Sequence, residues 1–169
     1  MIRAVACALA LAVTPALAAE PEVFPIDVVG NWVVMLRTEG GVAPECIAAS
    51  VNPAEDLVFG FRVDAEGTWA LHFKLPGRDM PERAGPLRLD VDYQRFEVQG
   101  IAEGEDIYVA AAEFAPLFLA IRDGRALALY SPSGKRIATA SLAGSAAALV
   151  AFGECFDRIA TSPEPDPFI

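Results

Sequence analysis

The sequence predicts a mainly β protein, either an antiparallel β-sandwich or an open barrel, with a short C-terminal helix. Many short segments alternate apolar and polar residues, which is the pattern of a half-buried strand. Turn-forming residues separate these segments. Only the region before the C-terminus has a long stretch with helical spacing. This combination favours antiparallel strands over an α/β arrangement.

The predicted strands differ in how clearly they alternate. The hairpin formed by 57–64 and 68–75 is the clearest, because both arms keep a period of two and Ala65-Glu66-Gly67 forms a turn between them. Composition predicts a loop over 76–86 and an acidic turn over 100–106. The remaining predicted strands are 31–37, 45–51, 87–93, 96–98, 107–111, 125–131 and 136–142.

Two helices are predicted in the C-terminal third. The first is short, covers 112–122, contains Pro116 and ends at Asp123-Gly124. The second runs from 146 to about 156, with Ser145 as its N-cap. The apolar face of this second helix carries Ala148, Phe152 and Cys155, so the cysteine should point inward.

The N-terminus predicts a signal peptide over 1–18. A short basic start precedes an apolar run of about ten residues and an A-x-A ending, so cleavage is expected between Ala18 and Ala19. The run is too short to span a bilayer, which takes about 20 apolar residues, and no later stretch is longer. We therefore expect a periplasmic or secreted protein without a membrane span.

The mature chain is expected to hold one domain. Residues 19–30 are acidic and proline-punctuated, which predicts a flexible leader. Residues 31–158 form the single β-rich domain. Residues 159–169 form an acidic, proline-rich tail whose composition argues against folding.

The cysteines indicate a disulfide. Cys7 falls inside the signal segment, which leaves Cys46 and Cys155 in the mature chain. In an oxidising compartment such a pair most simply forms one disulfide, with two free thiols as the alternative.

Charge and composition exclude several classes of function. The net charge is −10 and becomes more negative on cleavage, which argues against nucleic acid as a partner. The glycines are scattered at turns, so no phosphate-binding loop is visible. One histidine and two paired cysteines make a zinc site improbable. We expect no cofactor and no metal.

Asp90 and Asp92 are the only candidate binding residues. Alternation places both on the solvent face of one strand, near Arg88. Paired carboxylates can act as acid and base or bind calcium, but a solvated strand face is the simpler interpretation of this pair. A second acidic cluster lacks the pattern of an EF-hand and consists of Glu103, Glu105 and Asp106.

Three further residues have ordinary structural interpretations. His72 lies on the outward side of its strand, where a lone histidine is usually a surface residue. No serine lies in a nucleophile-elbow pattern that would recruit it. Trp32 and Trp69 are more simply core residues than the lining of a groove.

Two segments resemble the invasion-associated locus B family. The first is S-L-A-G-S-A-A-A-L-V-A-F-G-E-C at 141–155, and the second is N-W-V-V-M-L-R at 31–37, followed by the strand bearing Cys46. Family members usually carry an extra cysteine near the position of Met35, and a glutamine-bearing strand where this chain has Ala48-Ala49-Ser50. The resemblance is that of a divergent relative. It implies a small periplasmic or secreted β-sandwich and transfers no catalytic residue.

The sequence thus favours an exported, non-enzymatic binding protein. Its expected partner is another envelope protein or a small ligand. The alternative is an enzyme or enzyme inhibitor that uses a carboxylate or calcium site at Asp90 and Asp92.

Overall fold

The ten strands in the described part of the chain form one antiparallel open sheet. The computed structural model describes residues 22–39, 42–52, 57–110 and 114–160. The strand order is β1-β2-β3-β4-β5-β8-β7-β6-β9-β10. The mainly β class and the C-terminal helix are therefore confirmed. The elements are β1 (Glu22–Val29), β2 (Trp32–Glu39), β3 (Val42–Asn52), β4 (Leu57–Asp64), β5 (Trp69–Lys74), β6 (Met80–Val91), β7 (Gln94–Gly104), β8 (Asp106–Ala110), α1 (Phe114–Asp123), β9 (Ala126–Tyr130), β10 (Arg136–Ser141) and α2 (Ser145–Ala160).

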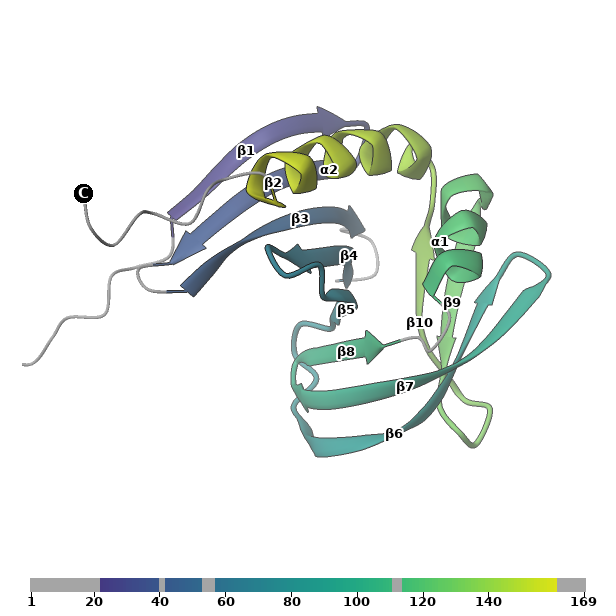
Figure 1. Cartoon of the computed structure of the whole chain (residues 1–169). Helices are drawn as coiled ribbons and strands as arrows, with labels where there is room; N and C mark the ends of the chain where they lie inside the picture. Colours follow the sequence, from purple (N-terminus) through teal and green to yellow (C-terminus); the bar gives the residue numbers. More distant parts are fainter. Residues whose placement is uncertain (1–21, 40–41, 53–56, 111–113, 161–169) are drawn as a thin grey trace, which may run out of the picture.

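The sheet is strongly curved, so that its two halves face each other. In Figure 1, β1 to β5 pass along the upper left, and β8, β7 and β6 turn back below them toward β9 and β10. The last strand, β10, comes into contact with β3 and β4 although no strand pairing joins them. Helix α2 covers β1, β2 and β3, and α1 packs against α2. One continuous sheet thus encloses a core that a sandwich would build from two.

Alternate residues of β4 and β5 are buried and form part of the core. Phe59, Phe61 and Val63 of β4 are fully buried, as are Leu71 and Phe73 of β5. The intervening residues point to the outer face, as the period of a strand requires. The predicted hairpin is confirmed, because these two strands pair from Val58↔Lys74 to Val63↔Trp69.

The region predicted as a loop over 76–86 is largely strand. β6 begins at Met80 and pairs with β7 through Arg83↔Ala102 and Gly85↔Gly100. Accordingly β7 extends to Gly104 and replaces most of the acidic turn predicted over 100–106. Most side chains of this stretch of β6 are exposed, so backbone pairing holds it without a buried face. A pattern of apolar burial could not reveal such a strand.

The leader predicted over 19–30 also contains a strand. β1 pairs with β2 along its length, from Glu22↔Thr38 to Val29↔Trp32, with a register shift after Pro25. Nearly all its side chains are exposed, and β1 is the edge of the sheet. An edge strand is the position where proline is tolerated, because its outer side needs no backbone donor. The domain therefore begins before residue 31.

The two helices match their predicted positions and differ in detail. Pro116 lies in the first turn of α1, where the missing N–H is not needed by the helix. The Ser145 hydroxyl donates to the carbonyls of Ile121 and Arg122 at the end of α1, at 2.9 and 3.2 Å. It therefore joins the two helices instead of serving as the predicted N-cap. Helix α2 also continues to Ala160, past the predicted end at 156.

The predicted disulfide is confirmed. Cys46 of β3 and Cys155 of α2 are bonded, with their Cα atoms 6.0 Å apart. Both are buried, and Ala148 and Phe152 share the buried face of α2 as expected. A disulfide of this kind persists in oxidising compartments outside the cytoplasm. It fixes the last helix to an early strand across 109 residues of sequence.

Two further expectations concern the chain ends and the membrane. The signal peptide with its cleavage point between Ala18 and Ala19 lies outside the described residues, as does the tail beyond Ala160. Among the helices of the described chain, neither has the length and apolar character that a membrane span requires.

Candidate functional site

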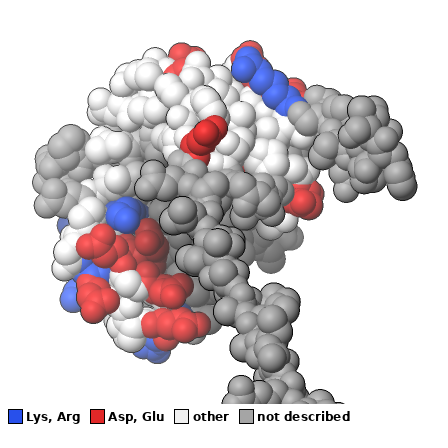
Figure 2. Space-filling view, turned by 90° about the vertical axis from the view of Figure 1, so that its left-hand side faces the viewer, with Lys and Arg blue, Asp and Glu red and all other residues white. Residues whose placement is uncertain are grey.

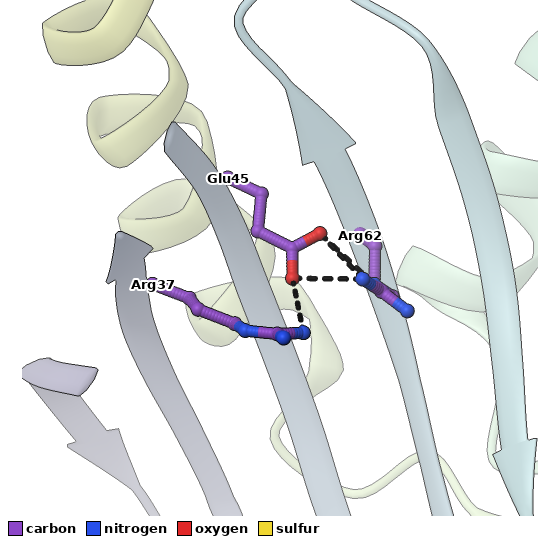
Figure 3. A network of polar contacts seen from close by, with 3 residues as sticks. All are labelled: Arg37, Glu45 and Arg62. Atoms are coloured by element: carbon purple, nitrogen blue, oxygen red, sulfur yellow. Dashed lines mark hydrogen bonds and ion pairs between the residues drawn. The ribbon is translucent and has the colours of Figure 1, made fainter. Parts of the chain in front are cut away.

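Glu45 joins three neighbouring strands on the outer face of the sheet. Its carboxylate accepts hydrogen bonds from Arg62 of β4 through Nε at 3.1 Å and Nη2 at 2.8 Å, and from Arg37 of β2 at 3.2 Å (Figure 3). All three side chains are partly buried. We call Arg37, Glu45 and Arg62 the carboxylate clamp. A carboxylate held in this forked way has both of its oxygens engaged by guanidinium donors.

The clamp affects the protonation of Arg62. Burial by itself lowers the pKa of this guanidinium, but the hydrogen bond and charge of Glu45 together raise that pKa above its ordinary value. Arg62 therefore stays charged and bound to Glu45. The clamp has the properties of a structural contact and not of a vacant binding site.

His72 continues this outer-face network on β5. Its Nε2 lies 2.6 Å from Asp106 Oδ1, and its ring stacks on Tyr108 with centroids 4.8 Å apart. The Arg62 guanidinium lies over the Tyr108 ring, 5.6 Å from its centroid. The predicted outward orientation of His72 is correct. Burial lowers the pKa of His72 and outweighs the opposing contact with Asp106, so the ring is mainly neutral at pH 7.

Asp90 and Asp92 do not form a pair on one face. Asp90 lies on β6 and forms ion pairs with Arg88 at 3.1 Å, at an angle too bent for a hydrogen bond, and with Arg95 at 3.6 Å. β6 ends at Val91, and Asp92 turns the chain with a φ of 50°. Its carboxylate accepts the backbone N–H groups of residues 125 and 126. The shared solvent face predicted from alternation is therefore wrong, because the strand ends one residue before Asp92.

The second acidic cluster is also divided among separate contacts. Figure 2 shows acidic side chains gathered on the lower part of the face that includes the β7–β8 turn. Glu105 accepts the backbone N–H of Gly77 at 2.7 Å and lies 3.8 Å from Lys74. Asp106 binds His72. Across the described ranges, no three side chains of the metal-ligating types come together in a way that could hold an ion.

The two tryptophans pack as predicted. Trp32 is fully buried, and its Nε1 donates to the carbonyl of Ala143 at 3.0 Å. Trp69 is half-buried and packs against the core. Its aromatic neighbours are Phe114, Phe118, Phe152 and Phe156.

A pocket of about 300 Å³ lies where the curled sheet brings β10 near the start of β4 and the end of β5. We call it the seam pocket. Leu57 and Leu75 are both buried and are among its lining residues, and Arg78 donates from Nη1 to the carbonyl of Ile137 at 3.0 Å. The lining residues are Leu57, Leu75, Arg78, Arg136, Ile137, Ala138 and Thr139.

Sequence reasoning missed the seam pocket entirely. Its residues come from three segments that lie far apart in the chain, and one of them, Arg78, belongs to a segment predicted only as a loop. Neither alternation nor composition marks these residues as neighbours. Only the curvature of the sheet brings them together.

A second pocket of about 350 Å³ lies between α1 and the β6–β7 turn. Its two carboxylates already have partners: Asp92 binds backbone N–H groups, and Asp123 forms a two-fold contact with Arg122 at 2.7 Å. The hydrogen bond from Arg122 lowers the pKa of Asp123. The polar groups of this pocket therefore serve the fold more clearly than those of the seam pocket.

Comparison with family models, with curated proteins and with solved structures gives no match for this chain.

Proposed function

We propose that the protein is an exported, non-enzymatic binding protein that holds a small ligand in the seam pocket. The observation that carries this proposal is the pocket itself, whose accessible lining is mostly polar and which the buried Leu57 and Leu75 also line. Ligand sites are typically concave and carry a few polar groups that orient the ligand. At about 300 Å³ the pocket is near the small end of such sites.

The residues first considered for catalysis support a structural role instead. His72 contacts Asp106 and Tyr108, Asp90 contacts two arginines, and Asp92 accepts backbone donors. A general acid or base must be placed where it can reach a substrate proton. None of these three groups lines the seam pocket.

The disulfide and the N-terminal sequence both support a place of action outside the cytoplasm. Disulfides persist mainly in oxidising compartments. Export by a signal peptide over 1–18 accounts for how the chain reaches that compartment. Sequencing the N-terminus of the protein recovered from the periplasm or medium should find Ala19 first. An uncleaved Met1 would contradict this part of the proposal.

The kinship with the invasion-associated locus B family rests on the two segments that resemble it. The disulfide and the β-rich fold are compatible with that kinship. We propose a distant relationship only, and no host-interaction role is carried over with it.

The proposed function can be tested by native mass spectrometry. Protein purified without denaturation from the exported fraction should carry a small molecule in part of the population. Replacing Ile137 by Trp should fill the pocket and remove that molecule, whereas Ile101→Trp on the exposed outer face should not. If a crosslinked protein partner were recovered instead, with binding unaffected by Ile137→Trp, the seam pocket would not be the functional site.

A further inference from the structure

The seam pocket concentrates positive charge in an acidic protein. The chain has 23 acidic and 13 basic side chains, yet Arg78 and Arg136 both line this pocket. Among the described residues that line it there is no aspartate or glutamate. The pocket therefore differs in charge from the surface of the protein as a whole.

The two pocket arginines differ from the arginines of the outer face. Arg37 and Arg62 share Glu45, and Arg88 pairs with Asp90. The guanidinium of Arg136, in contrast, makes no hydrogen bond or ion pair with any described residue, although the backbone of Arg136 pairs with β9. Its guanidinium donors are available to a ligand.

Arg78 is held in position without losing its charge. One nitrogen of its guanidinium, Nη1, donates to the Ile137 carbonyl, which is a neutral partner. A guanidinium has five N–H donors in a planar fork, so most of them remain available. Glu105, which reaches the same turn by accepting the Gly77 N–H, already faces Lys74 at 3.8 Å.

The contact between Arg78 and Ile137 also restricts the kind of ligand. It covers a carbonyl on β10, which is the last strand of the sheet. A peptide that extended the sheet would need such backbone groups. The pocket is therefore better suited to a small molecule than to an added strand.

We propose that the seam pocket binds the anionic head, a carboxylate or phosphate group, of a small and partly apolar molecule. Arg136 and Arg78 would bind the anion through charge-assisted hydrogen bonds, for which the guanidinium fork is well shaped. Leu57, Leu75 and Ile137 would contact the apolar part. This inference rests on the proposed function and adds to it the chemical class of the ligand.

The test uses calorimetric titration of the mature protein with three probes at low ionic strength. Hexanoate supplies a carboxylate with an apolar chain, inorganic phosphate supplies an anion alone, and 1-hexanol supplies the chain alone. We expect hexanoate to bind more tightly than hexanol and to weaken as salt is added. Tighter binding of phosphate than of hexanoate would still support the anion site and identify phosphate as its head group.

Arg136→Gln and Arg125→Gln form a matched pair of variants. Both remove one charge from an exposed arginine, and Arg125 lies outside the pocket. Arg136→Gln should weaken anion binding about tenfold, the usual effect of losing one charge-assisted hydrogen bond, and Arg125→Gln should leave it unchanged. Equal effects of the two variants would overturn the inference.

Failure of the inference can be separated from failure of the proposed function. If hexanol binds as tightly as hexanoate and Ile137→Trp abolishes both, the pocket binds ligands but does not select anions. If none of the three probes binds and the native protein carries no molecule, both proposals are wrong.

Discussion

The carboxylate clamp and the seam pocket both contain arginine side chains, but the two regions give these arginines opposite electrostatic surroundings. In the clamp, Arg37 and Arg62 surround Glu45, and the next residue, Cys46, ties β3 to α2 through the disulfide (Figures 1 and 3). At the seam, Arg136 has no carboxylate partner among the described residues, and β10 meets β3 and β4 without pairing with either.

This difference separates charged residues that stabilise the fold from charged residues that can bind a ligand. A partly buried charge that has its partner inside the protein contributes to the fold and has little left for a ligand. An exposed charge without a partner contributes little to the fold, because surface charges are well solvated. Variants of the clamp should therefore change stability, whereas variants of the seam should change binding.

The disulfide should give the largest effect. Replacing Cys46 and Cys155 together by Ala should lower the free energy of unfolding by about 4 kcal/mol, because the crosslink closes a long loop in the unfolded chain. Urea denaturation measures the loss, and the reduced wild-type protein should lose a similar amount. Unchanged stability on reduction would mean that the bond does not restrain the unfolded chain.

The clamp should give the next largest effect. Glu45→Gln should cost about 2 kcal/mol, because it removes the negative charge that two partly buried guanidinium groups contact. Glu103→Gln is the control, since Glu103 is exposed and should change stability little. Equal stability of the two variants would contradict the distinction between clamp and seam.

His72 should make stability depend on pH. Its pKa is lowered in the folded state, so below about pH 6.5 the unfolded chain binds more protons than the folded one. Stability should therefore fall as the pH decreases from 7 to 5. His72→Gln should reduce this decrease, as measured by urea denaturation at both pH values. A steeper decrease in the variant would reverse the sign of the expected shift.

Arg136 should give the smallest effect on stability. Arg136→Gln should change the free energy of unfolding by less than about 0.5 kcal/mol, as for most surface substitutions. Thermal or urea unfolding without ligand checks this. A large loss would place Arg136 in the fold rather than at a binding site.

Several features of the protein were determined by local sequence. The hairpin of β4 and β5 follows from alternation, because each strand buries one face completely. The inward position of Cys155 follows from helical spacing with Ala148 and Phe152. Both patterns involve only residues that are close together in the sequence, so they can be recognised without knowledge of the rest of the fold.

Other features depend on contacts with distant parts of the chain, and local sequence patterns do not predict those contacts. β1 and the start of β6 are strands because a neighbouring backbone pairs with them, while their side chains stay exposed. Asp92 turns the chain instead of continuing β6, where its carboxylate can accept two backbone N–H groups. Backbone pairing leaves no apolar pattern from which it could be predicted.

The sequence by itself determined the mainly β class, the disulfide and the core face of the last helix, because periodicity and cysteine number are properties of short segments or of simple counts. Only the tertiary structure decided where a ligand could bind. The seam pocket joins Leu57, Arg78 and Arg136, which become neighbours only after the whole sheet has curled. The physical reason is that curvature arises from the summed pairing of all ten strands and from no single one of them.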